Sequence, residues 1–281
     1  MKNYLKVLGA TIPPLTAVAV QLIVATVLNM AYSTIIGIKA ETGQVAGALD
    51  IRVEITYLFS ALAVMSSGIV FLFWYRRETF KEERGKFKHV VNRKNICKFA
   101  CLALGCQLFV SGLISILTEY FPKAFDNYGD TIKSILSGSP VVVVIVTVVI
   151  APITEELIFR GVTLHMANRY IPFLAANAFQ AVLFGVYHGN LVQGIYAAGL
   201  GFILGVICDK FRTIYAPIIL HMMVNASAFF LMLLPESMLS YFVISIIGFV
   251  LVVISLSIIK PNKNQELQGI TKKSVNKESV I

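Results

Sequence analysis

The stretch PVVVVIVTVVIAPITEELIFRG, residues 140–161, places two glutamates and an arginine directly behind an uninterrupted apolar run. A helix needs about 20 mostly apolar residues to cross the hydrocarbon layer of a bilayer. An ionisable side chain inside such a helix costs about 2.5 to 3.5 kcal/mol on insertion scales, so it usually marks function or a paired charge. The stretch therefore predicts a membrane helix that carries a buried polar site.

The composition of the whole chain indicates the same environment. Of its 281 residues, 57% are apolar and only 14% are charged, whereas soluble domains have about 45 to 50% and about 25%. The charges cluster between uncharged blocks, which excludes a disordered chain, a secreted disulfide scaffold, and nucleic acid as the partner of the net charge of +9. The four cysteines form no C-x-x-C pair, and we expect them to be reduced and structural.

Seven stretches lack Asp, Glu, Lys and Arg and can be assigned as membrane spans. The fifth is too long for one crossing and is interrupted by His188, Gly189 and Asn190, so we predict a pair of helices there. The stretches are 7–38, 55–75, 99–118, 134–154, 170–208, 213–235 and 237–259. The predicted fold is all-α: a polytopic membrane helix bundle of about eight transmembrane helices.

The distribution of basic residues predicts the orientation of this bundle. An even number of crossings places both termini on one side, and the side richer in Lys and Arg is normally cytoplasmic. With cytoplasmic termini, the only basic residues in outer loops are Lys39, Arg52, Lys123 and Lys133, out of 24 in the chain. We expect a multi-pass protein of the cell membrane, surrounded by lipid, with both termini in the cytoplasm.

The chain divides into three predicted parts, and none is a soluble domain. They are an N-terminal membrane region at 1–133 with three transmembrane helices and a basic cytoplasmic loop (76–98), a core at 134–259, and a polar cytoplasmic tail at 260–281. In the core, Ala197, Gly201 and Gly205 recur every four residues, a spacing that lets helix backbones approach closely. We interpret these three residues as a packing face.

Helical geometry gives the two neighbouring glutamates different environments. Residues four apart share a helix face, whereas sequence neighbours point about 100° apart. Glu156 lies four residues before Arg160, and we predict an ion pair between them as a buried supporting contact. Glu155 is then left to face another helix without a cation of its own, which favours a functional role.

Two further polar groups fall at a compatible depth. The midpoint between Glu155 and His188 is Ile171–Pro172, a natural helix break, so an antiparallel hairpin that turns there brings both residues to one level. His221 and Asn225 are four apart and share one face of the next helix. We expect the four side chains to converge, nearer the cytoplasmic leaflet than the outer one.

The chemistry of this group indicates hydrolysis. A carboxylate and an imidazole can hold and deprotonate water, and a second imidazole with an amide can stabilise the oxyanion that forms when water attacks a peptide carbonyl. The same side chains could instead ligate a divalent metal such as zinc. Because neither His-Glu-x-x-His nor another compact zinc motif is present, we rank water held by Glu155 and His188 above zinc.

Three motifs together resemble the CPBP intramembrane proteases, a family that includes the type II CAAX prenyl endopeptidases and the bacterial Abi and bacteriocin-processing relatives. They are E-E-x-x-F-R-G at 155–161, F-x-x-x-H at 184–188 and H-x-x-x-N at 221–225, each on a separate predicted helix and in family order. The resemblance covers Pro140 to about Ala228, within the core, which is then a CAAX-protease-like catalytic core.

The resemblance implies a role for each motif residue. Glu155 would activate water together with His188, and His221 and Asn225 would form the oxyanion hole. The supporting residues would be Glu156, Arg160 and Phe184. The family is often called a metalloprotease family, while a metal-free glutamate mechanism has been argued for prenyl-protein members. If the reaction is metal-dependent, Glu155, His188, His221 and Asn225 would be the ligands.

These observations predict an intramembrane endopeptidase that acts on a membrane-associated peptide or protein. The sequence does not identify that substrate. The alternative is a non-catalytic membrane scaffold or bacteriocin-immunity protein that binds a partner and keeps the motifs as a structural polar network. A transporter is disfavoured, because its substrate path would need polar residues through both halves of the bilayer.

Overall fold

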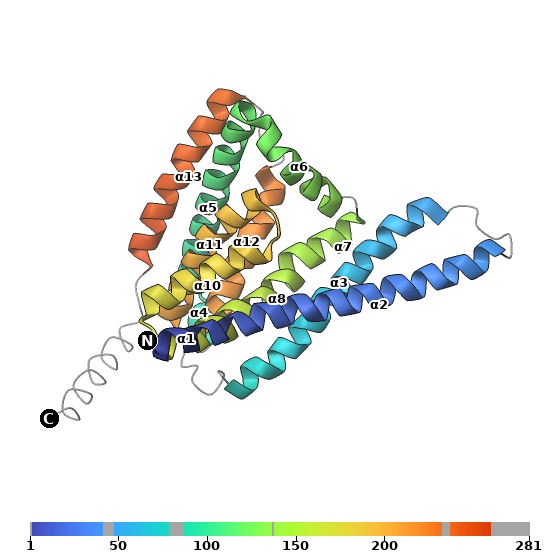
Figure 1. Ribbon diagram of the computed structural model, residues 1–281. Coiled ribbons are helices and arrows are strands. Elements are labelled where there is room, and N and C mark those ends of the chain that lie inside the picture. Colours follow the sequence, from blue (N-terminus) through green and yellow to red (C-terminus); the bar gives the residue numbers. More distant parts are fainter. Residues whose placement is uncertain (1, 42–47, 79–86, 137, 232–236, 260–281) are drawn as a thin grey trace.

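The described part of the chain is helical throughout, as the computed structural model shows (Figure 1). It comprises residues 2–41, 48–78, 87–136, 138–231 and 237–259. The predicted tail at 260–281 and part of the predicted basic loop, 79–86, lie outside these residues. The first half contains α1 (Lys2–Val7), η1 (Leu8–Thr11), α2 (Ile12–Glu41), α3 (Ala48–Glu78), α4 (Phe87–Val90), α5 (Arg93–Tyr120) and α6 (Pro122–Leu136).

The second half contains the helices that carry the three motifs. They are α7 (Pro140–Val144), η3 (Ile145–Ile150), α8 (Ala151–Glu156), η4 (Leu157–Leu164), α9 (His165–Asn168), α10 (Phe173–Tyr187), α11 (Leu191–Phe211), α12 (Tyr215–Leu231) and α13 (Met238–Ile258). Within the described ranges, six helical segments are long and apolar enough to cross a membrane, and α10 and most of α12 are shorter apolar helices. The prediction of an all-helical, multi-pass membrane bundle is confirmed.

The segment from Pro140 to Asn168 is one continuous helix with two π-helical sections, η3 and η4, on either side of α8. Pro152 has no N–H to donate inside this helix, and the wider π turn of η3 lies just before it. Such π sections occur frequently at functional sites. They flank the short α-helical section that carries both glutamates.

The hairpin between this helix and the next is confirmed. α9 ends at Asn168, Pro172 is the N-cap of α10, and α10 begins at Phe173. The predicted packing face of α11 is also confirmed, because Ala197 and Gly201 are buried and α10 packs along α11. A side chain added at Gly201 would meet Phe184 and Arg160.

The N-terminal helices surround the core from two sides. α2 and α3 lie side by side and extend away from the rest of the bundle (Figure 1). α5 packs along α13, where Gly105, Gly112 and Gly248 allow close backbone approach. The start of α1 and the end of α13 lie at the same end of the bundle (Figure 1). The division at residue 133 remains a prediction.

The connection between α5 and α7, which was expected to be an outer loop, contains a helix. α6 runs from the far end of α5 to α7 (Figure 1). It is too short and too polar to be a span, with Lys123, Asp126, Asp130 and Lys133 all exposed. Its apolar side chains lie toward the bundle, so α6 is an amphipathic helix at the end of the bundle.

Candidate active site

The predicted ion pair between Glu156 and Arg160 is present and fully enclosed. Arg160 Nη1 donates to Glu156 Oε1 at 2.7 Å, and neither side chain is exposed. Arg160 Nη2 also donates to the Gly201 carbonyl at 2.8 Å, and its guanidinium lies over the Phe184 ring at 4.6 Å from the centroid. Arg160 therefore joins the helix Pro140–Asn168, which carries the first motif (155–161), to α11 and α10.

His221 lies between the two glutamates. Its Nδ1 donates to Glu156 Oε1 at 2.9 Å, and its Nε2 is 3.7 Å from Glu155 Oε2. The ring is buried. Because a carboxylate can only accept, the contact with Glu156 fixes the proton on Nδ1 and the ring orientation. Nε2 is then the nitrogen that faces Glu155.

Glu155 differs from its neighbour in both exposure and partners. Its side chain is 14% exposed, against none for Glu156. In the described ranges its only ion-pair contact is with His221, and no lysine or arginine lies within ion-pairing distance. It is the accessible carboxylate of the pair, as the helical spacing indicates.

Phe184 and His188 lie on one side of α10 and complete the cluster. The Phe184 ring makes edge contacts with His188 at 4.8 Å and with His221 at 5.9 Å between centroids. His188 Nδ1 donates to the Phe184 carbonyl at 2.8 Å. Gly189 follows with a positive φ of 67°, which reverses the chain at the end of α10. His188 thus points its Nε2 away from its own helix.

Asn225 lies one turn beyond His221 on α12. Its amide Nδ2 donates to the Thr147 carbonyl in η3 at 2.8 Å. The structure thus brings together Glu155, Glu156, Arg160, Phe184, His188 and His221, each in contact with at least one other member. Among the described residues, Glu155 and His188 form no direct hydrogen bond or ion pair with each other, and Asn225 is held by the backbone of motif one's helix.

The segment that contains this cluster is similar to known proteins. Residues 137–227 match the family described as "Type II CAAX prenyl endopeptidase Rce1-like". The resemblance is confirmed over that segment. "Putative membrane peptidase YdiL" from Bacillus subtilis (strain 168) is 26% identical to the chain over 130 residues, which cover 46% of the chain and 53% of that protein. The chain thus spans about half the length of this curated relative. No solved structure matches the chain of residues 1–281.

The Rce1-like segment contains all seven of the motif residues to which the resemblance assigns a role, and the N-terminal helices lie outside it. The N-terminal helices nevertheless contact the motif helices, and Gln21 of α2 hydrogen-bonds the Tyr187 hydroxyl beside His188. The N-terminal region therefore supports the end of α10. This contact had no signal in the sequence beyond a polar residue inside an apolar span.

Sequence reasoning also missed a second buried polar network behind the arginine. Gln180 Nε2 donates to Asn177 Oδ1 at 2.8 Å and to the Gly201 carbonyl at 3.0 Å, and Asn177 donates to the Phe202 carbonyl. Both side chains are fully buried. The sequence signal for this network was the presence of Asn177 and Gln180 in the apolar stretch before Phe184 and His188. Thr147, in the valine-rich run before Glu155, is a similar polar residue in an apolar stretch.

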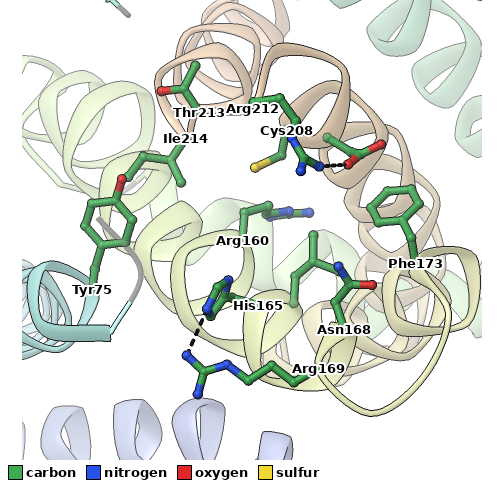
Figure 2. Close-up of a pocket in the computed structure, with 12 residues that line it drawn as sticks. Tyr75, Arg160, His165, Asn168, Arg169, Phe173, Cys208, Arg212, Thr213 and Ile214 are labelled. Atoms are coloured by element: carbon green, nitrogen blue, oxygen red, sulfur yellow. Dashed lines mark hydrogen bonds and ion pairs between the residues drawn. The ribbon is translucent and has the colours of Figure 1, made fainter. Parts of the chain in front are cut away.

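A polar cavity of about 260 Å³ opens on the other side of Arg160 (Figure 2). His165, Arg169 and Arg212 line it, and Figure 2 shows Arg169 directed at His165 and Arg212 at a carboxylate, which is that of Asp209. A cavity of this size with polar walls can hold several waters. The cavity extends from Arg169 and Arg212 to Arg160 of the buried ion pair.

The residues do not form the ligand set that a zinc ion requires. In the described ranges, no three His, Cys, Asp or Glu side chains gather in a way that could hold a metal. Glu156 Oε1 accepts from both Arg160 and His221 Nδ1. His188 Nε2, His221 Nε2 and Glu155 would be the remaining donors, and only the last two are in contact.

Proposed function

We propose that the chain is an intramembrane endopeptidase that hydrolyses a peptide bond of a membrane-associated peptide or protein. The observation that carries the proposal is the accessible, cation-free Glu155 in contact with His221 and beside a fully buried ion pair. The match to the Rce1-like family over residues 137–227 supports the same class of reaction. The similarity to a protein named as a membrane peptidase adds to this support.

The proposed reaction uses water as the nucleophile. Glu155 takes a proton from a water that His188 orients, and the water oxygen bonds to the scissile carbonyl carbon. The carbonyl oxygen becomes an oxyanion that Asn225 Nδ2 and His221 Nε2 stabilise. For this role His221 carries a proton on Nε2 in addition to the one that Nδ1 donates to Glu156. When the C–N bond breaks, the proton held by Glu155 passes to the leaving amine. Glu156 and Arg160 act as positioning residues through His221.

Two of these roles require a small rearrangement. Asn225 donates to Thr147 in the free protein, so it must turn one N–H toward the substrate, and an amide has two to offer. His188 and Glu155 need a bridging water, since they are not in direct contact. Catalytic hydrogen bonds are often loose before substrate binds.

The proposal also includes the membrane in which the protein lies and the half of the bilayer that contains the active site. The positive-inside rule supports a cell-membrane protein with the ends of α9 and α11, which carry Arg169 and Arg212, in the cytoplasm. His221 lies six residues after the start of α12 at Tyr215, or about 9 Å along the helix axis. These positions support an active site in the cytoplasmic half of the bilayer.

The experiment that tests the function is cleavage of a peptide library by the full chain purified in detergent. Glu155→Gln is expected to reduce cleavage by at least about a hundredfold, since a general base contributes about 10² to 10⁴. Glu119→Gln, at the exposed end of α5, is the matched control and should leave the rate unchanged. Equal cleavage by Glu155→Gln would contradict the proposal and favour a non-catalytic scaffold.

A parallel sample with a strong zinc chelator separates the two chemistries. Cleavage that persists after chelation supports a reaction carried by Glu155 itself. Cleavage that is lost on chelation and restored by added zinc would show that a metal activates the water.

A further inference from the structure

A second cavity reaches the candidate active site at Asn225. It has a volume of about 350 Å³, within the range of about 300 to 1,000 Å³ that ligand sites occupy, and Asn225 and Thr147 are among the residues that line it. We call it the α6 chamber, because Tyr128, Ile132 and Ile135 of α6 also line it.

Polar side chains line the α6 chamber although helices of the membrane bundle enclose it. They are Gln107, Ser111, Ser115, Tyr128, Gln193 and Tyr196. Polar groups inside a membrane protein are costly and usually face a partner or a water-filled path. The structural hydrogen bond between Gln107 and Ser111, at 3.0 Å, uses only part of this donor and acceptor capacity.

An extended peptide is the ligand that such a lining fits. A helical segment satisfies its own backbone hydrogen bonds, whereas an extended segment in the bilayer needs partners for every N–H and C=O. The amides and hydroxyls of the α6 chamber can provide them. A neighbouring apolar cavity of about 390 Å³ shares Tyr196 and Leu200 with the chamber and suits a large apolar side chain.

α6 covers the chamber without being firmly buried. None of its side chains is fully buried, although its Tyr128 makes an edge contact with Tyr196 of α11 at 6.2 Å between ring centroids. An amphipathic helix at the end of the bundle with few fixed contacts can move away at low cost. The Tyr128–Tyr196 contact is the point where it is held to the core.

We propose that the α6 chamber binds the extended segment of an apolar peptide substrate next to its scissile bond, with Tyr128 and Tyr196 selecting the side chains that are accepted. The inference rests on the proposed endopeptidase function. It adds that substrate is bound between Asn225 and α6, and that α6 must move for the peptide to enter.

The first test compares cleavage profiles on a library in which one position varies from Ala to Phe. Tyr196→Ala and Tyr128→Ala are expected to change the relative kcat/KM of the small and large peptides by about tenfold or more. Tyr120→Ala, at an exposed site outside the chamber, is the matched control. Unchanged profiles in both alanine variants would overturn the proposal.

The second test reads binding without cleavage. An apolar hexapeptide carrying photoreactive benzoylphenylalanine is cross-linked to the Glu155→Gln protein, and the adducts are located by mass spectrometry. Adducts on α6 and on α11 near Tyr196 support the proposal. Adducts confined to the Arg160 cavity, or none, overturn it. If the chain cleaves no peptide but binds the probe in the chamber, only the proposed hydrolysis fails.

Discussion

At Arg160 the guanidinium donates to Glu156 and to Gly201 while its face lies over Phe184. Removing one member of a buried ion pair leaves the other charge uncompensated, which costs about 3 to 5 kcal/mol. Arg160→Met should therefore lower the free energy of unfolding by about that amount in an SDS titration of mixed micelles. Arg169→Met, whose side chain is 44% exposed, is the control and should change stability little.

The two glutamates should respond differently to the same substitution. Glu156→Gln removes a charge that holds both Arg160 and His221, so we expect lower stability and lower activity together. Glu155→Gln alters a partly exposed group, so activity should fall while the melting temperature stays within a few degrees of the unaltered chain. Equal loss of stability in the two variants would show that Glu155 is structural.

The residue scale also shows what a single sequence can predict. Glu156 and Arg160 are four apart on one helix, and that spacing alone predicted their contact correctly. The contact of His221 with both glutamates depends on how α12 is rotated against the helix of motif one, and the period of a helix does not specify this rotation. The same limit applies to Asn225, whose convergence with Glu155, His188 and His221 remains a prediction and whose amide donates to the Thr147 carbonyl.

At the scale of elements, α11 places its backbone against the helices of the first and second motifs through Gly201. A methyl group there would lie 2.9 Å from Phe184 and 3.2 Å from Arg160. Overpacking of this kind typically costs about 1 to 3 kcal/mol, so Gly201→Ala should lower both stability and cleavage. Gly199→Ala is the matched control two residues away, where a methyl group would meet no atom within 4 Å. Equal stability of the two variants would contradict the close packing of Gly201 against Phe184 and Arg160.

Element boundaries followed from charge and hydropathy only in part. The apolar stretches predicted where the spanning helices lie, and Ile171–Pro172 predicted the hairpin turn. The helix of the first motif continues through its charged residues to Asn168, as the hairpin turn at Ile171–Pro172 predicted, and Glu156 and Arg160 neutralise each other inside it. The π sections η3 and η4 have no recognised residue pattern, and α6 is too short and polar for a span.

At the scale of the whole molecule, the orientation in the membrane is the main untested prediction. In a chain whose four cysteines are replaced by serine, a membrane-impermeant thiol reagent should label Lys123→Cys in intact cells. Asn168→Cys should react only after the membrane is opened. Both sites are exposed and lie at opposite ends of the bundle. The reverse labelling pattern would invert the topology.

The overall architecture was predictable where the bilayer dictates it. Helix content and multi-pass character follow from the need to satisfy every backbone group inside lipid. The arrangement of the N-terminal helices was not predictable, because apolar side chains face lipid and protein alike and leave no periodic signal. This is why the contact of Gln21 with Tyr187 and the splayed α2–α3 pair emerge only from the structure.

In the proposed reaction, Glu155 activates a water molecule that attacks the peptide bond. The measurement that tests this role is the mass of the product formed from a cleaved peptide in heavy-oxygen water under single-turnover conditions. We expect one heavy oxygen in the new carboxyl group of the peptide, none in the Glu155 side chain, and product formation by Glu155→Gln that is slower by at least about a hundredfold. Heavy oxygen in Glu155 after later turnovers would indicate an acyl-enzyme, and labelled product from Glu155→Gln at the normal rate would show that Glu155 is not the base.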